Sequence, residues 1–256
     1  MKWWLRLPLT TKIFIGMILG FLAGLIYPPA GSLKWLGDIF INVIQVVIIP
    51  LVFAALTVAM ANLTDLGRFG RIAGKTLFFY IFTTIVATII GVLFANLFQP
   101  GSGLDVATIA KLAPPKPAKA PSLGDVMVGL FPKNIVDSMA KGTIVQVVMF
   151  SIVFGLVVGR LGKKAERIRA AMEELYQIMI KMIWVIMELA PYGVFALMAW
   201  FIAQTGFGAV IPVLKYMVAV ILGILFQTFV VVSLFVWLIA RVSPIQFYRR
   251  SVDYIM

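Results

Sequence analysis

Long apolar runs that contain no charged residue dominate this chain. They cover residues 39–64, 76–104, 189–214 and 216–240. A helix needs about 20 consecutive apolar residues to cross the hydrocarbon core of a bilayer, and each of these runs is long enough. A soluble domain would have to bury all of them in one small core. The pattern therefore predicts an all-α, polytopic membrane protein.

The apolar pattern divides into six spans. We place them at residues 11–27, 35–62, 75–98, 142–161, 164–204 and 210–240. Pro50 and Pro191 lie inside the second and fifth spans, where a residue without an N–H donor predicts a helix bend. Gly16, Gly20 and Gly24 share one face of the first helix. In lipid, such a face predicts close contact with another helix.

The polar segments between and after the spans differ in character. Residues 113–121 are rich in proline and predict an extended, solvated stretch within the long loop 99–141. Residues 122–131 predict a short interfacial helix. The end of the chain, 244–256, predicts an amphipathic helix that carries Arg249 and Arg250.

Charge sets the expected orientation. The net charge is +12, and most of the 22 lysines and arginines fall on the cytoplasmic side if six spans start from a cytoplasmic N-terminus. Seven spans would place Arg241, Arg249 and Arg250 outside. We therefore expect a multi-pass protein of the cell (inner) membrane with both ends cytoplasmic. Its two groups of three spans then have opposite orientation, which is the topology of inverted-repeat transporters.

Composition narrows the chemistry. Hydrophobic residues make up 62% of the chain and the mean hydropathy is +1.05. There is no cysteine and no histidine, which removes disulfides, the commonest transition-metal ligand and the commonest general base. The sequence has no phosphate loop and no nucleophile–base pair. We therefore expect no enzyme, no cofactor, no transition metal and no nucleic-acid partner.

Few polar side chains lie inside the spans. Lys181 and Glu188 share a helix face; Lys181 is expected to extend its ammonium group to the interface, and Glu188 either pairs with it or approaches the interface itself. The uncharged polar residues are expected to form hydrogen bonds between helices. They are Asn42, Gln45, Asn96, Gln146, Ser151, Gln227 and Ser233.

A cluster of hydroxyl groups in the third span is more suggestive of a ligand. Tyr80, Thr83 and Thr84 lie three and four residues apart, on one side of a helix. Their uncharged oxygens suit Na⁺, which prefers hard oxygen ligands. Alternatively, each threonine hydroxyl donates to the carbonyl one turn earlier. From spacing alone we favour this second interpretation.

Several stretches, taken in order, resemble the dicarboxylate/amino acid:cation symporter family, to which glutamate and aspartate transporters belong. They are residues 12–20 (KIFIGMILG), 49–55 (IPLVFAA), 80–84 (YIFTT), 190–197 (APYGVFAL), Gln227 and 243–247 (SPIQF). The resemblance covers essentially the whole chain, and it is specific through the order and spacing of these stretches rather than through any single motif.

The resemblance implies a homotrimer with an elevator-like cycle. Residues 1–74 and 142–205 then supply scaffold helices, and 75–98 is a helix of the mobile transport domain. Residues 99–141 form an extracellular loop, and 206–256 supply a second transport-domain helix and a cytosolic tail. Tyr80, Thr83 and Thr84 match a family position that contributes to a deep Na⁺ site, which raises our expectation that they bind a cation.

The chain departs from the family in one respect. The family builds its substrate site from two re-entrant hairpins and two later helices, with a serine-rich stretch and an Asn-Met-Asp-Gly-Thr motif that this sequence lacks. We expect the chain to be the N-terminal part of a longer polypeptide. The alternatives are a truncated polypeptide and a natural or engineered half-protein.

The expected activity is Na⁺- or H⁺-coupled symport of an acidic amino acid or C4-dicarboxylate, which would need the missing C-terminal region. Two alternatives are a non-transporting trimeric membrane scaffold and an anion-conducting channel.

Overall fold

The computed structural model describes residues 7–63, 66–100 and 122–255, and within them it is helical apart from short turns, with no strand. Five described segments are long and apolar enough to cross a membrane: Leu9–Ile26, Pro29–Ala61, Gly70–Phe98, Ile144–Met187 and Val210–Ile239. The prediction of an all-α, polytopic membrane protein is confirmed. The chain divides into two compact units, Met1–Phe69 with Ala113–Gly206, and Gly70–Leu112 with Phe207–Met256.

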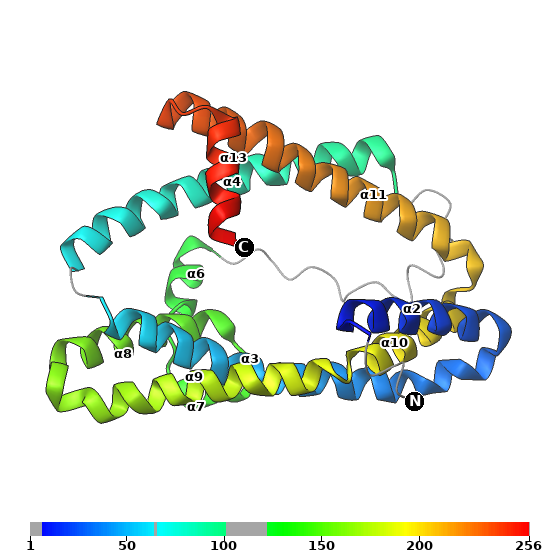
Figure 1. Ribbon diagram of the computed structural model, residues 1–256, viewed down its shortest axis with the longest axis horizontal. Coiled ribbons are helices and arrows are strands. Elements are labelled where there is room, and N and C mark those ends of the chain that lie inside the picture. The colour runs from blue at the N-terminus through cyan, green and yellow to red at the C-terminus, as the bar shows by residue number, and fades with distance from the viewer. Residues whose placement is uncertain (1–6, 64–65, 101–121, 256) are drawn as a thin grey trace. The chain divides into compact units, whose positions relative to one another are not determined.

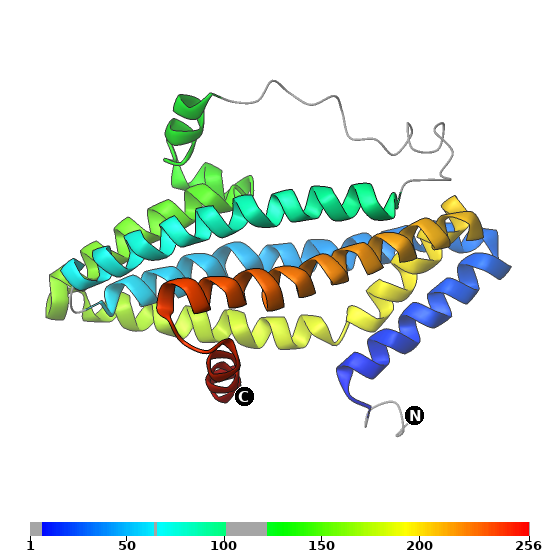
Figure 2. The ribbon, with the colours of Figure 1, turned by 90° about the horizontal axis from the view of Figure 1, so that it is seen from above.

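The long helix α3 is the centre of the first unit. It runs from Lys34 to Ala61 and packs against three other helices, α8 (Ile144–Leu161), α9 (Glu166–Met187) and α10 (Ala190–Thr205). Helix α2 (Leu9–Ile26) lies along α10, and the short 3₁₀ turn η1 (Pro28–Leu33) joins α2 to α3. Figures 1 and 2 show α2 in blue beside α10 in yellow.

The contact between α2 and α10 depends on glycine. Gly16, Gly20 and Gly24 are the buried residues of α2, and a Cβ atom on any of them would collide with the backbone of α10. The carbonyl oxygens in the way belong to Pro191, Phe195 and Ala199, in that order. Lipid supplies no hydrophobic force between helices, so such close backbone approach is a main source of attraction. The predicted close helix contact of this face is confirmed.

A second seam of small residues joins α3 to α8. A Cβ atom on Gly155 would lie 2.6 Å from the carbonyl oxygen of Thr57, and one on Gly159 would lie 2.8 Å from that of Ala61. Rings of Phe53, Phe150 and Phe154 stack beside this seam, with centroids 5.7 to 6.1 Å apart. Small residues bring the two backbones together, and the aromatic rings fill the space next to them.

The predicted fifth span consists of two helices rather than one bent helix. Helix α9 ends at Met187, a two-residue turn follows at Glu188 and Leu189, and Pro191 lies in the first turn of α10. Proline is well tolerated there because the first N–H groups of a helix have no intrahelical acceptor. Pro50 lies inside α3, which continues through it without interruption.

The number of crossings stays a prediction. By length and composition, α8 and α9 together form one candidate membrane span of 44 residues. Helix α10, with 16 residues, is shorter than a usual membrane span. The chain nevertheless reverses at η2 (Gly162–Ala165), where Gly162 has a positive φ of 53°. Because α8 and α9 both pack along α3, they run back over the same length, as Figure 1 shows. This reversal is compatible with two crossings.

Two short helices precede α8. The predicted helix at 122–131 is present as α6 (Leu123–Gly129), and the hydroxyl of Ser122 accepts the N–H of Asp125 in a capping box. The hydrogen bond that Ser122 donates to this carboxylate lowers the pKa of Asp125. Helix α7 (Ile135–Ala140), which begins at the Asn134 cap, was not predicted from the sequence. The expected extended stretch 113–121 lies outside the described residues.

The second unit contains α4 (Leu66–Phe98), except for its first residues, and the helices that follow residue 206. After the 3₁₀ turn η3 (Phe207–Ala209), the last predicted span comprises α11 (Val210–Phe226), a π-helical segment η4 (Gln227–Val232), α12 (Ser233–Phe235) and a second π-helical segment η5 (Val236–Ala240). The predicted amphipathic helix is α13 (Pro244–Ile255). The π-helical turns were not predicted.

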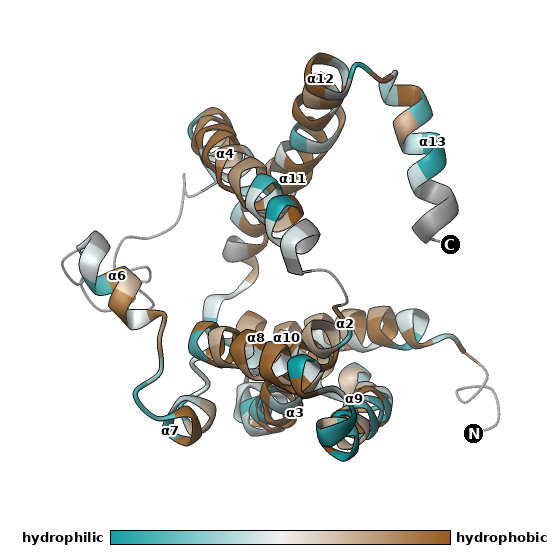
Figure 3. Ribbon diagram, turned by 90° about the vertical axis from the view of Figure 1, so that its left-hand side faces the viewer, coloured by the Kyte–Doolittle hydropathy of each residue, from teal (hydrophilic) through white to brown (hydrophobic). Residues whose placement is uncertain are grey.

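Aromatic rings of α4 contact rings of both α11 and α12. Phe94 lies 5.9 Å from Phe226, and Phe82 lies 5.4 Å from Phe235, measured between ring centroids. Most other large apolar side chains on these helices are exposed, including Phe78 at 67%. Figure 3 shows the hydrophobic colouring of α4 and α11 and the hydrophilic stretches of α9 and α13. Such exposed apolar faces suit contact with lipid.

Two glycine-to-alanine substitutions test the α2–α10 contact. Gly20→Ala is expected to lower the free energy of unfolding by about 1–3 kcal/mol, because its methyl group meets the α10 backbone. The matched control, Gly91→Ala, has open space around it and is expected to be neutral or to gain up to about 1 kcal/mol in helix propensity. Thermal unfolding in detergent measures both, and equal effects would contradict the prediction.

Candidate functional site

The three predicted cation ligands lie on one side of α4. Tyr80 is 72% exposed and Thr84 is exposed, while Thr83 is half-buried. Nothing in the described residues covers the phenol of Tyr80. The structure therefore places the hydroxyl groups on a common, accessible helix face.

Both threonine hydroxyls donate to carbonyl groups of the preceding turn. Thr83 Oγ1 lies 2.8 Å from the carbonyl oxygen of Phe79 and 3.1 Å from that of Tyr80, and Thr84 Oγ1 lies 2.7 Å from the latter. The alternative favoured from spacing is thus what these hydroxyls do in this structure. A hydroxyl that donates its proton still has its oxygen lone pairs, so this bonding leaves both oxygens able to accept.

Gln227 connects this part of α4 to the other long helix of the unit. Its amide Nε2 donates to the backbone carbonyl of Thr83 over 3.3 Å, as expected for a polar residue that bonds between helices. The other amide atom, Oε1, is buried and has no hydrogen-bond partner among the described residues. A buried acceptor without a partner is costly, which marks this position as one where a further donor or a cation would be stabilising.

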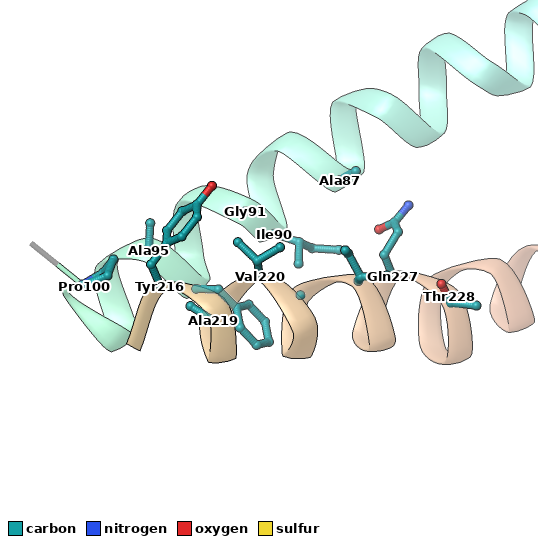
Figure 4. Close-up of a pocket in the computed structure, with 13 residues that line it drawn as sticks. Ala87, Ile90, Gly91, Ala95, Pro100, Tyr216, Ala219, Val220, Gln227 and Thr228 are labelled. Carbon is teal, nitrogen blue, oxygen red and sulfur yellow. The ribbon is translucent and has the colours of Figure 1, made fainter. Parts of the chain in front are cut away.

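A mostly apolar cavity of about 350 Å³ lies between α4 and α11 beside Gln227. It is lined by residues that include Ile90, Phe94, Tyr216, Ile224, Gln227 and Thr228. Figure 4 shows Gln227 rising from its helix toward α4 at one end of this cavity. The lining offers no cationic side chain, so the cavity does not suit a carboxylate ligand.

The charged residues of the fifth span do not pair. Lys181 and Glu188 are both exposed, and the ion pairs of the described residues are Lys34 with Asp38 and Lys141 with Asp137, each at 2.8 Å. Of the two alternatives for Glu188, pairing with Lys181 is therefore absent here. The described residues also contain no cluster of acidic side chains that could hold a metal ion.

Comparison with known proteins gives one family. The family model of the sodium:dicarboxylate symporters matches residues 9–256. The chain is 32% identical to a proton/sodium-glutamate symport protein of Geobacillus stearothermophilus, over 89% of the chain and 56% of that protein. It is 32% identical to a proton/glutamate-aspartate symporter of Escherichia coli (strain K12), over 93% of the chain and 60% of that protein.

A third relative carries a different substrate name. A C4-dicarboxylate transport protein of Bacillus subtilis (strain 168) is 31% identical, over 88% of the chain and 55% of that protein. The chain thus spans a little over half the length of these curated relatives.

Comparison of two glutamines tests the role of the unpartnered amide oxygen of Gln227. Gln146 uses both amide atoms, donating to the Gly129 carbonyl at 3.0 Å and accepting from Ser138 at 2.6 Å, so Gln146→Met is expected to cost about 1–2 kcal/mol. Gln227→Met loses one long hydrogen bond and also removes a buried unpaired oxygen, so it is expected to cost less than about 1 kcal/mol. Thermal unfolding in Na⁺-free detergent buffer compares them, and a larger loss at Gln227 would contradict the prediction.

Proposed function

The chain belongs to the sodium:dicarboxylate symporter family, and from this premise we propose that the complete protein is a secondary active symporter for an acidic amino acid or a C4-dicarboxylate. The observation that carries the proposal is the family match over residues 9–256, together with relatives named for glutamate, aspartate and C4-dicarboxylate. The activity is proposed for the complete protein because the chain spans only part of those relatives.

The proposed coupling ion is Na⁺, with H⁺ as the alternative, and the proposed ligands are Tyr80, Thr83 and Thr84. Support comes from their position on one accessible face of α4 and from hydroxyl oxygens that keep free lone pairs. Residues 76–104 contain no charged residue, and the chain has no histidine, so this helix offers no acidic or imidazole group to carry a proton. That absence favours Na⁺ over H⁺.

The proposed mechanism is of the elevator type in a homotrimer of the cell membrane. One unit, built around α3, would act as the static scaffold, and the other, containing α4 and α11, would move. Support comes from their different construction, since glycine residues bring helices of the first unit into backbone contact, whereas α4 is joined to the last predicted span by ring contacts and the Gln227 amide. The orientation with both ends in the cytoplasm rests on the distribution of lysine and arginine.

Threonine-to-valine substitutions in the complete protein test the cation site. Thr83→Val and Thr84→Val keep the side-chain shape but remove an oxygen, and each is expected to raise the Na⁺ concentration for half-maximal uptake by about ten-fold or more. The control is Thr88→Val, one turn further along, whose hydroxyl donates to the Thr84 carbonyl at 2.8 Å and which lies outside the proposed site. The measurement is Na⁺-driven uptake of glutamate, aspartate or succinate into liposomes.

The same assay separates the proposed function from its rivals. Gradient-driven uptake of an acidic substrate supports symport. A stable trimer that takes up nothing and carries no current would instead support a scaffold, and ion current without substrate would support a channel. If Thr88→Val raised the Na⁺ requirement as much as Thr83→Val and Thr84→Val do, the assignment of Thr83 and Thr84 as ligands would be wrong.

A further inference from the structure

Tyr248 of α13 contacts the π-helical segment η4 through both its ring and its hydroxyl group. The ring lies 5.6 Å from that of Phe229, measured between centroids. The hydroxyl donates to the backbone carbonyl of Thr228 and accepts a hydrogen bond from Ser233 Oγ over 3.3 Å. One side chain of α13 therefore holds three positions of the preceding helix.

The two hydrogen-bonding positions have a particular spacing. Thr228 and Ser233 are five residues apart, which is the repeat that distinguishes a π-helix from an α-helix. If this segment changed from π-helical to α-helical geometry, the helix beyond it would rotate by about 100° relative to α11. A hydroxyl that bonds to both ends of this repeat stabilises the π-helical register against the α-helical one.

Correct register matters for two contacts with α4. Gln227, at the start of η4, donates to the Thr83 carbonyl, and Phe235, beyond η4, packs its ring against Phe82. The first contact precedes the inserted turn and the second follows it. Both can form together only if η4 keeps its π-helical geometry, since a rotation by about 100° would turn Phe235 away from α4.

The chain path brings α13 back to η4. Arg241 has a left-handed backbone with a φ of 52°, which ends η5 and allows the turn into α13 at Pro244. Tyr248 is half-buried at this contact. The hydroxyl therefore has an enclosed position beside a carbonyl that hydrocarbon could not satisfy.

We propose that Tyr248 is a positioning residue for the candidate cation site, because its hydroxyl holds η4 in the register that lets Phe235 pack on Phe82 while Gln227 bonds to the Thr83 carbonyl. The proposal rests on the proposed Na⁺ site of Tyr80, Thr83 and Thr84. Tyr248 does not itself touch the ion. It acts through η4, whose register keeps the Gln227 and Phe235 contacts on α4 beside the residues that would bind the ion.

The test is Tyr248→Phe in the complete protein, which keeps the ring and removes the hydroxyl. The Na⁺ concentration for half-maximal uptake is expected to rise about two- to ten-fold, because the substitution removes both hydrogen bonds of the hydroxyl and loosens η4. The maximal uptake rate is expected to stay within about two-fold, since the residue does not contact the transported solutes. The control is Tyr176→Phe, which removes an exposed hydroxyl from α9, away from the candidate site.

A second measurement reports on the segment itself. Hydrogen exchange of the amides of 227–233 is expected to be faster in Tyr248→Phe than in the unmodified protein, while Tyr176→Phe leaves it unchanged. Faster exchange with an unchanged Na⁺ requirement would overturn the proposal, because Tyr248 would then only stabilise the helix. Unchanged exchange would overturn it as well.

The unmodified protein distinguishes the two levels of inference. If its uptake does not depend on Na⁺, the proposed cation site is wrong and this proposal falls with it. If its uptake depends on Na⁺ and Thr83→Val weakens that dependence while Tyr248→Phe does not, only the role of Tyr248 is wrong.

Discussion

Hydrocarbon offers no hydrogen-bond partner to a backbone N–H or C=O group, and this constraint shapes every described part of the chain. Apolar segments satisfy it by forming helices. Where the regular ladder changes, another group takes over. In the π-helical segment, Tyr248 donates to the carbonyl of Thr228. Within the regular helix α4, the hydroxyls of Thr83 and Thr84 also donate to backbone carbonyls, those of the preceding turn.

Once the backbone is satisfied, helices in lipid need a reason to associate, and the two units use different ones. The first unit relies on close backbone approach, at Gly20 on α10 and at Gly155 on α3. Dispersion forces are strongest at such short range. In the second unit a cavity lies between α4 and α11, and phenylalanine rings connect α4 to α11 and to α12. The second unit therefore has fewer tight contacts that resist deformation.

Most of the fold could be predicted from the sequence because hydrophobic periodicity directly reports membrane helices. The apolar runs predicted the α-helical class, and the four-residue spacing of Gly16, Gly20 and Gly24 predicted a contact face. The partner of that face could not be predicted, because nothing in α2 encodes which helix supplies the carbonyls. The short helix α7 was missed because its signal, the Asn134 cap, is a local hydrogen bond between longer polar stretches.

The candidate site was only partly predictable for a related reason. The sequence shows that Tyr80, Thr83 and Thr84 share a face, but not whether their hydroxyls donate to the backbone, since that depends on side-chain rotation. The bond from Gln227 to Thr83 joins positions 144 residues apart, and no local pattern encodes it. The π-helical turns have no sequence signature at all, since they follow from packing rather than from the preference of any residue.

The α2–α10 seam has an asymmetric consequence for how the sequence can vary. On one side the contact is made by the absence of a side chain, and on the other by main-chain oxygens that every amino acid possesses. Replacing the half-buried Phe195 leaves the oxygen in place, whereas replacing Gly20 inserts an atom where none fits. At this pair of positions the sequence of α10 can therefore change more freely than that of α2, although both helices share the contact.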